Sequence, residues 1–171
     1  MPPPLDRGRG SADARPRLDE LVPETACPER RILDRDMAAA CCAGLWLYHN
    51  YLDESHTISQ SIDTPTGSFW HGMMHRREGD YSNAKYWFRR VGEHPVFIRL
   101  CGAANLLASE AQLDAAGHFL VAQSAWDPFA WIDLCELVVK GASTQDAFCR
   151  EIQQREWELL FDYCFRHAFA A

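Results

Sequence analysis

Apolar residues recur at intervals of three and four along most of this 171-residue chain, and no useful stretch alternates apolar with polar residues. Cys41, Leu45, Tyr48 and Leu52 follow this spacing. A period near 3.6 is typical of amphipathic helices, whereas strands alternate with a period of two. The length suits one ordinary domain, and 47% hydrophobic residues are enough for a core. We therefore predict an all-α fold, a single-domain irregular bundle of about six or seven helices.

Capping and breaking residues divide the chain into expected helices. Asp127-Pro128 places an N-cap residue before a proline at the first helical position, and Pro95 suits the first turn of another helix. Ser68 can cap a helix, and residues 63–67 (Asp-Thr-Pro-Thr-Gly) predict a break before it. The expected helices span residues 34–52, 54–62 (separate from the first or continuous with it), 68–78, 80–91, 96–109, 127–141 and 143–168.

Residues 1–30 are rich in Pro, Arg, Asp and Gly and show little apolar periodicity. We expect a flexible or loosely docked N-terminal arm that can be removed, followed by a single helical domain at 31–171. No apolar run reaches the roughly 18 to 20 residues that a membrane span needs. The first residues also lack the apolar stretch of a signal peptide. We therefore expect no membrane association.

The seven cysteines are odd in number and include no Cys-x-x-Cys pair, so they indicate neither a disulfide framework nor a zinc ribbon. Most of them fall on apolar helical faces. We interpret them as small buried hydrophobic side chains in a reducing, cytoplasmic setting. A nucleophilic thiol at Cys41 or Cys42 is not indicated, because an apolar helix face raises the pKa of a thiol.

The charge distribution separates one basic window from an otherwise acidic chain. The net charge is −7 at pH 7, which argues against a general nucleic-acid binder. Residues 70–99 carry six Lys or Arg against three acids, whereas residues 100–171 carry four bases against ten acids. The basic charge of the folded part is therefore gathered in 70–99.

Part of this window resembles the second helix of a tetratricopeptide repeat. The matching features are a Gly-Asp-Tyr turn, a small residue, an aromatic four positions on, an apolar residue and a closing proline. They are carried by Gly79, Asp80, Tyr81, Ala84, Phe88, Val91 and Pro95, with Trp70 near the position of the first-helix tryptophan. The resemblance implies a helical hairpin at 68–92. The pattern is not reiterated elsewhere, so it gives little support to a peptide-binding solenoid.

The longer string FWHGMMHRREGDYSNAKYWFRRVGEHPVF, residues 69–97, is similar to an uncharacterised family of small bacterial and fungal proteins. The resemblance extends upstream to residues 53–56 and downstream to residues 156–162. It is specific as a family label. It implies no activity and assigns no role to any residue.

Five of the seven histidines lie between His49 and His94, and two sets repeat one spacing. His49, Asp53 and His56 stand at offsets 0, 4 and 7, as do His71, His75 and Glu78. If the first helix runs unbroken through Asp53, each set shares one helix face, and helical bundles build metal sites from such facing stripes. The candidate metal ligands are His49, Asp53, His56, His71, His75 and Glu78, for Zn, Fe, Mn or Ni. A metal-free polar pocket and simple structural roles are the alternatives.

The basic window adds candidates for binding an anion. Arginine forks, and a lysine near aromatic rings, suit a carboxylate or a phosphate. The alternative is that these bases pair with the surplus acids of residues 100–171. The candidate ligand-binding residues are Arg76, Lys85, Arg89 and Trp87, and the candidate catalytic residues are His71, His75, Glu78 and Glu54.

Together these features predict a protein that binds an anionic small molecule in a His/Arg/Lys-lined pocket between helices. In an enzymatic version, His or Glu supplies acid–base chemistry or a divalent metal assists. The rival interpretation is a non-catalytic protein-interaction module built on the hairpin. The sequence leaves open whether the protein is an enzyme, and whether it forms a homodimer or binds a protein partner.

Overall fold

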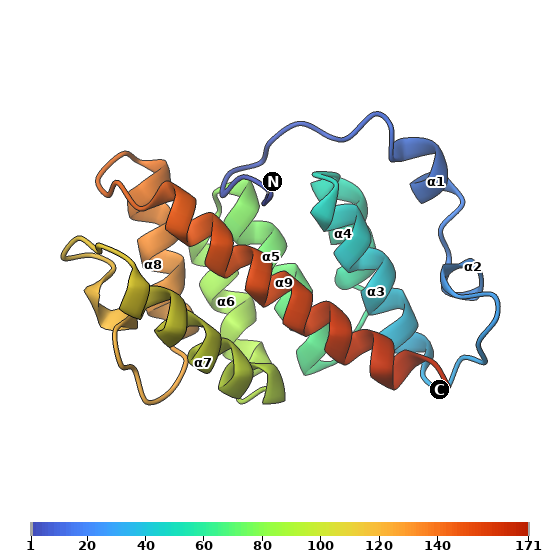
Figure 1. Ribbon diagram of the computed structural model, residues 1–171. Coiled ribbons are helices and arrows are strands. Elements are labelled where there is room, and N and C mark those ends of the chain that lie inside the picture. The colour runs from blue at the N-terminus through green and yellow to red at the C-terminus, as the bar shows by residue number, and fades with distance from the viewer. Residues whose placement is uncertain (1, 171) are drawn as a thin grey trace.

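Nine α-helices and one short 3-10 helix form the regular structure of residues 2–170, the part of the chain that the computed structural model describes (Figure 1). No strand occurs in this part, and the one β contact is an isolated antiparallel bridge between Ile32 and Phe169. The all-α prediction is confirmed, and seven of the helices fall within 31–171. The elements are α1 (Arg15–Asp19), α2 (Pro23–Ala26), α3 (Arg35–Tyr48), α4 (Leu52–Ser59), α5 (Pro65–Glu78), α6 (Tyr81–Val91), α7 (Pro95–Glu110), η1 (His118–Leu120), α8 (Pro128–Val139) and α9 (Asp146–Ala168).

Most helix starts follow the capping signals, but α5 begins three residues before its expected start at 68, and α9 begins three residues after its expected start at 143, without a side-chain cap. A side chain accepts a backbone N–H at the N-cap of α3, α5, α6, α7 and α8, and proline opens α5, α7 and α8. The prediction that Ser68 caps a helix after a break was wrong. Thr64 caps α5 instead, accepting from the N–H of Gly67 at 3.1 Å, because Pro65 fits the first helical position.

The expected helix at 34–52 is interrupted. α3 ends at Tyr48, and the chain turns through residues 49–51 before α4 begins. Asn50 has a left-handed backbone, with φ of 64°, a conformation that asparagine tolerates better than most residues. Its side-chain amide donates to the carbonyl of Arg9 at 3.0 Å and accepts from Arg77. These bonds hold a corner where the apolar spacing alone predicts continuous helix.

α5 and α6 form a closely packed antiparallel hairpin. Gly79 ends α5 in a left-handed conformation, with φ of 89°. Gly72 faces Phe88 so closely that a Cβ at this position would lie 2.7 Å from the ring. The hairpin expected at 68–92 is therefore present, while its likeness to a tetratricopeptide unit still rests on sequence alone.

The long helix α9 crosses the bundle in Figure 1 and packs against α3, α7 and α8. One core cluster is formed mainly by α3, α4, α5, α6 and the C-terminal half of α9. A second is formed mainly by α7, α8 and the N-terminal half of α9. Trp70 is fully buried in the first cluster and Trp131 in the second. Burying such side chains is the main source of stability, at about 1.5–3 kcal/mol for each large apolar residue.

The N-terminal arm lies along the helical domain. Ser11 bonds the carbonyl of His49 through its N–H at 3.0 Å, and its own carbonyl accepts from the hydroxyl of Tyr51 at 2.9 Å. Leu5 and Leu18 are buried. The arm therefore touches the domain at the corner between α3 and α4 and, through Leu5, at the second core cluster.

None of the helices in the described part of the chain is long and apolar enough to cross a membrane.

Candidate metal centre

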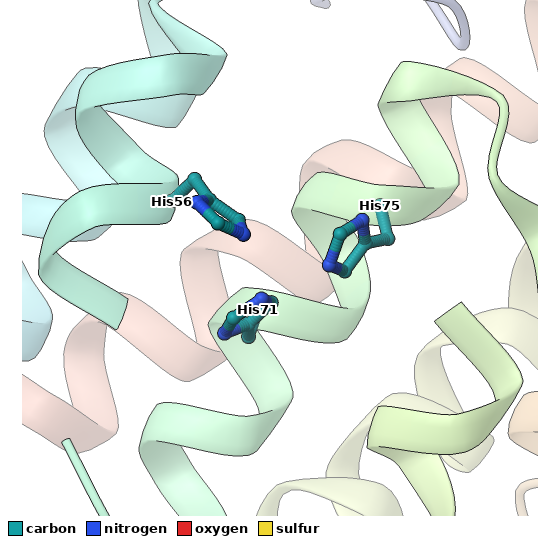
Figure 2. A group of neighbouring side chains, drawn as sticks. All are labelled: His56, His71 and His75. Carbon is teal, nitrogen blue, oxygen red and sulfur yellow. The ribbon is translucent and has the colours of Figure 1, made fainter. Parts of the chain in front are cut away.

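Three histidines from two neighbouring helices converge on one point. His56 comes from α4, and His71 and His75 stand one turn apart on α5. One ring nitrogen of each lies within 4.8 Å of the others. Figure 2 shows the three rings directed toward the space between the helices. The packing of α4 against α5 creates this juxtaposition.

The site lies at the edge of the core. His71 is 2% exposed and His75 is 6% exposed, while His56 is half-buried. His71 is stacked between neighbours, with its ring centroid 4.7 Å from that of His75 and 3.9 Å from that of Trp87. The rings are thus held by packing, with the His56 side nearest to solvent.

The two buried histidines are neutral at pH 7. Burial, together with the neighbouring His75 and His56, lowers the pKa of His71 to about 3. Burial also lowers the pKa of His75, against the opposite effect of Glu78. A neutral imidazole keeps one nitrogen lone pair for a metal ion or a proton. Among the described residues, Nδ1 of His71 is buried without a hydrogen-bond partner.

Glu78 sets the tautomer of His75. Its carboxylate oxygen lies 2.9 Å from Nδ1 of His75, and an ionised carboxylate can only accept. Nδ1 must therefore carry the proton, which leaves the lone pair on Nε2. Asn83 places its amide nitrogen 3.1 Å from Nε2 and 3.4 Å from Nδ1. Such similar distances to the two ring nitrogens put the amide nitrogen off the axis of the Nε2 lone pair. A hydrogen bond from the far ring nitrogen to a carboxylate, as His75 makes to Glu78, is characteristic of metal-bound histidine.

The hairpin register explains which α6 residues reach the site. Asn83 lies opposite His75, and Trp87 lies opposite His71, so each turn along α5 is matched by a turn back along α6. The sequence indicated Trp87 as a candidate site residue, but it did not indicate Asn83. An antiparallel register counted from the turn at Gly79 would have indicated both.

The first set of candidates is not brought together. Because the corner at Asn50 breaks the helix, the 0-4-7 spacing no longer describes one face. His49 lies at the C-cap of α3. Asp53 is exposed and pairs with Arg7, and Glu54 pairs with Arg15 of the arm. Only His56 joins the histidine cluster, and the candidates His49, Asp53 and Glu54 do not.

The basic candidates also lie apart from the histidines. Arg76 is fully buried and makes a two-pronged ion pair with Glu156 of α9, so it offers nothing to a ligand. Lys85 pairs with Asp133 of α8. Arg89 is exposed and lines a separate pocket. No shared pocket lined by His, Arg and Lys therefore forms from these residues, since successive positions on α5 and α6 face different neighbours.

Chemically, the cluster offers three nitrogen ligands. A tetrahedral zinc ion with bonds of about 2.0–2.1 Å holds its ligand nitrogens ~3.3 Å apart, so the rings would need to close slightly. Imidazole also suits iron and nickel. Three protein ligands with an open fourth position are the arrangement of catalytic zinc sites, whereas structural sites have four.

Comparison of the chain with protein-family models, with curated proteins and with solved structures finds no match.

Proposed function

We propose that the protein binds a divalent transition metal ion through His56, His71 and His75, and that this ion activates water to hydrolyse a small anionic substrate. The observation that carries the proposal is the convergence of three ring nitrogens within 4.8 Å. Two of these rings are buried and neutral, and one has an unpartnered nitrogen. Grouping three imidazoles without a cation between them leaves a buried donor or acceptor unsatisfied, which is costly.

A bound ion would supply two kinds of chemistry: it would lower the pKa of a bound water, and it would polarise a carbonyl or phosphoryl oxygen. A bound cation would also attract an anionic substrate. The protein's part is to hold the ligands. Glu78 fixes the His75 tautomer, and Trp87 packs against His71.

A second candidate, a protein-interaction surface on the hairpin, has one observation in its favour. Tyr86 is 46% exposed on α6. Trp87, the other aromatic side chain that such a surface would display, is instead stacked on His71. The histidine centre is therefore the better-supported function.

Metal analysis of the protein, purified without a histidine tag, tests the proposal. We expect close to one bound metal ion per chain, and stoichiometric rebinding of Zn²⁺ after removal by a chelator. Co²⁺ in place of zinc should give the intense visible absorption of a tetrahedral site. His56→Ala, His71→Ala and His75→Ala should each lower zinc affinity at least about 10 to 100-fold, the loss known for changes in supporting residues.

His49→Ala is the matched control, because His49 satisfies the sequence spacing but lies outside the cluster. It should bind zinc like the parent protein. Hydrolysis is then assayed with p-nitrophenyl phosphate and p-nitrophenyl acetate, one anionic and one neutral. Zinc-dependent turnover that favours the phosphate supports the proposal. Absence of metal binding, or equal binding by all four variants, would refute the metal centre. Binding without turnover would refute the hydrolytic role.

A further inference from the structure

A second cavity lies at the C-terminal end of α6. A pocket of about 920 Å³ is formed by the end of α6, the start of α7 and the segment that leads into α8. This volume is in the range of small-molecule sites, about 300–1,000 Å³. The pocket does not include the three clustered histidines, so it is independent of the metal centre.

The walls of the pocket are mainly aromatic. Phe88 and Trp126 are buried, and Phe97 and Phe129 are half-buried beside them. Ile98 stands at the same pocket and is 81% exposed. An apolar molecule seated here would remove aromatic and aliphatic surface from water, which is favourable in proportion to the area covered.

His94 contributes its ring to the wall and has no free nitrogen. Its Nδ1 accepts from the N–H of Val96 at 3.3 Å, and its Nε2 lies 3.2 Å from the hydroxyl of Thr66. Because Nδ1 accepts, Nε2 carries the proton and donates to Thr66. His94 therefore caps α7 and does not provide the polar recognition in this pocket.

Two residues of the lining carry hydrogen-bond donors without a partner in the described structure. Arg89 lines the pocket and has no ion-pair partner within residues 2–170. Trp126 is 7% exposed, and its indole N–H is buried without a hydrogen-bond partner in the described structure. Both groups can only donate. Glu93, also at the pocket, is exposed and is the opposing charge.

We propose that this pocket binds a small amphipathic carboxylate, with its aliphatic or aromatic body against the aromatic walls and its carboxylate facing Arg89 and Trp126. A carboxylate provides acceptors for both donors, and its pairing with a guanidinium is charge-assisted. A neutral hydrocarbon leaves the buried indole donor unsatisfied. An amine of the same length has no acceptor for either group and is favoured by Glu93 alone.

Calorimetric titration with decanoate and with decylamine, on the chelator-treated full-length protein, tests the proposal. We expect saturable binding of decanoate at one site, and at least tenfold weaker binding of decylamine. Arg89→Gln should weaken decanoate binding about tenfold, and Trp126→Phe, which keeps a ring but removes the donor, several-fold. Arg90→Gln makes the same charge change one residue away and does not line the pocket, so its affinity should stay within twofold.

Circular dichroism melts of each variant establish that the fold is kept. No saturable binding of decanoate, tighter binding of decylamine, or equal losses for Arg89→Gln and Arg90→Gln would overturn the proposal. Because the protein is free of metal throughout, these outcomes are independent of whether the histidine centre binds zinc.

Discussion

The imidazole of His71 lies face to face with the indole of Trp87, with ring centroids 3.9 Å apart and planes inclined by 16°. One residue comes from α5 and the other from α6. The ring of His75 also stacks on that of His71, with ring centroids 4.7 Å apart. The plane of the His71 ring is therefore fixed by two stacking neighbours. The orientation of a proposed metal ligand is therefore set by packing of the hairpin.

Replacing Trp87 with leucine should loosen His71. We expect a loss of about 1–2 kcal/mol in the free energy of unfolding, since an aromatic pair contributes about 0.5–1.5 kcal/mol beyond its buried area. Zinc affinity should fall about tenfold, as for other supporting residues. Urea unfolding and competition with a chromophoric chelator measure the two effects. Tyr86→Phe, which keeps the exposed ring that meets Trp87 edge-on, should change neither. Equal effects of both variants would contradict the stacking argument.

Acidic pH should destabilise the fold through His94. Burial, then the neighbouring His167, lowers the pKa of His94 from 6.5 to about 4. The contribution of neutral His94 to the free energy of unfolding is therefore complete above about pH 6.5. As the pH falls from there toward 4, the unfolded chain takes up a proton that the folded one refuses. The loss is roughly 1.4 kcal/mol per pH unit.

His94→Asn isolates this contribution. Asparagine can still cap α7 but does not titrate. In urea unfolding between pH 7.5 and pH 4.5, the variant should show a shallower decline in stability than the parent protein. Parallel declines would show that His94 is not the group responsible.

The buried ion pair between Arg76 and Glu156 predicts a strongly non-additive mutant cycle. Burial opposes the charge of Arg76, but Glu156 more than offsets it, so the pKa of Arg76 is raised. Arg76→Met or Glu156→Leu alone leaves the charge of the other partner buried and unpaired, which costs about 3–5 kcal/mol. The double variant Arg76→Met with Glu156→Leu should cost clearly less than the sum, as measured by chemical denaturation. Additive losses would mean that the pair is not coupled.

The cysteines should all be free thiols, with different accessibility. Six are buried and Cys27 is half-buried. Burial raises the pKa of Cys42 to about 11 and that of Cys135 to about 12, which suppresses the reactive thiolate. A thiol reagent should label one cysteine rapidly in the native protein, and seven after denaturation without reductant. Five or fewer after denaturation would reveal a disulfide.

Truncation tests the role of the arm. Leu5 is 3% exposed, and the carbonyl of Asp6 accepts from Nε of the buried Arg77 at 3.0 Å. Deleting residues 1–10 should therefore lower stability by about 2–4 kcal/mol, from one buried leucine and several lost carbonyl acceptors, those of Asp6 and Arg9 among them. Thermal unfolding should stay cooperative, and limited proteolysis should cut before Ile32. An unchanged melt would show that the arm is dispensable, as its composition alone suggests.

Much of the fold could be predicted from local signals. The start of α8 follows from Asp127-Pro128, and the hairpin follows from the turn at Gly79. The four-residue spacing of His71 and His75 identified the half of the histidine cluster that lies on one helix. These features depend on residues within one turn of each other, so their physics is contained in the sequence pattern.

The remainder depends on contacts between distant residues. Arg76 was expected to bind a ligand, and it instead meets Glu156, 80 positions away. Whether a base faces solvent, a ligand or a buried acid is decided by how helices pack, and spacing along one helix does not encode this. His56 was named on the assumption of a continuous helix, so its place in the cluster has a different cause from the one expected.

That cause is the corner at Asn50, and it gives this residue an influence that its chemistry does not suggest. Its amide joins the carbonyl of Arg9 in the arm and the guanidinium of Arg77 on α5. By turning the chain, it carries His56 to its two partners. A natural variant with all three histidines but a straight helix here would have every ligand and no centre. Comparing related chains for the histidines alone would therefore misjudge which of them share the site, and the residue to follow is the asparagine.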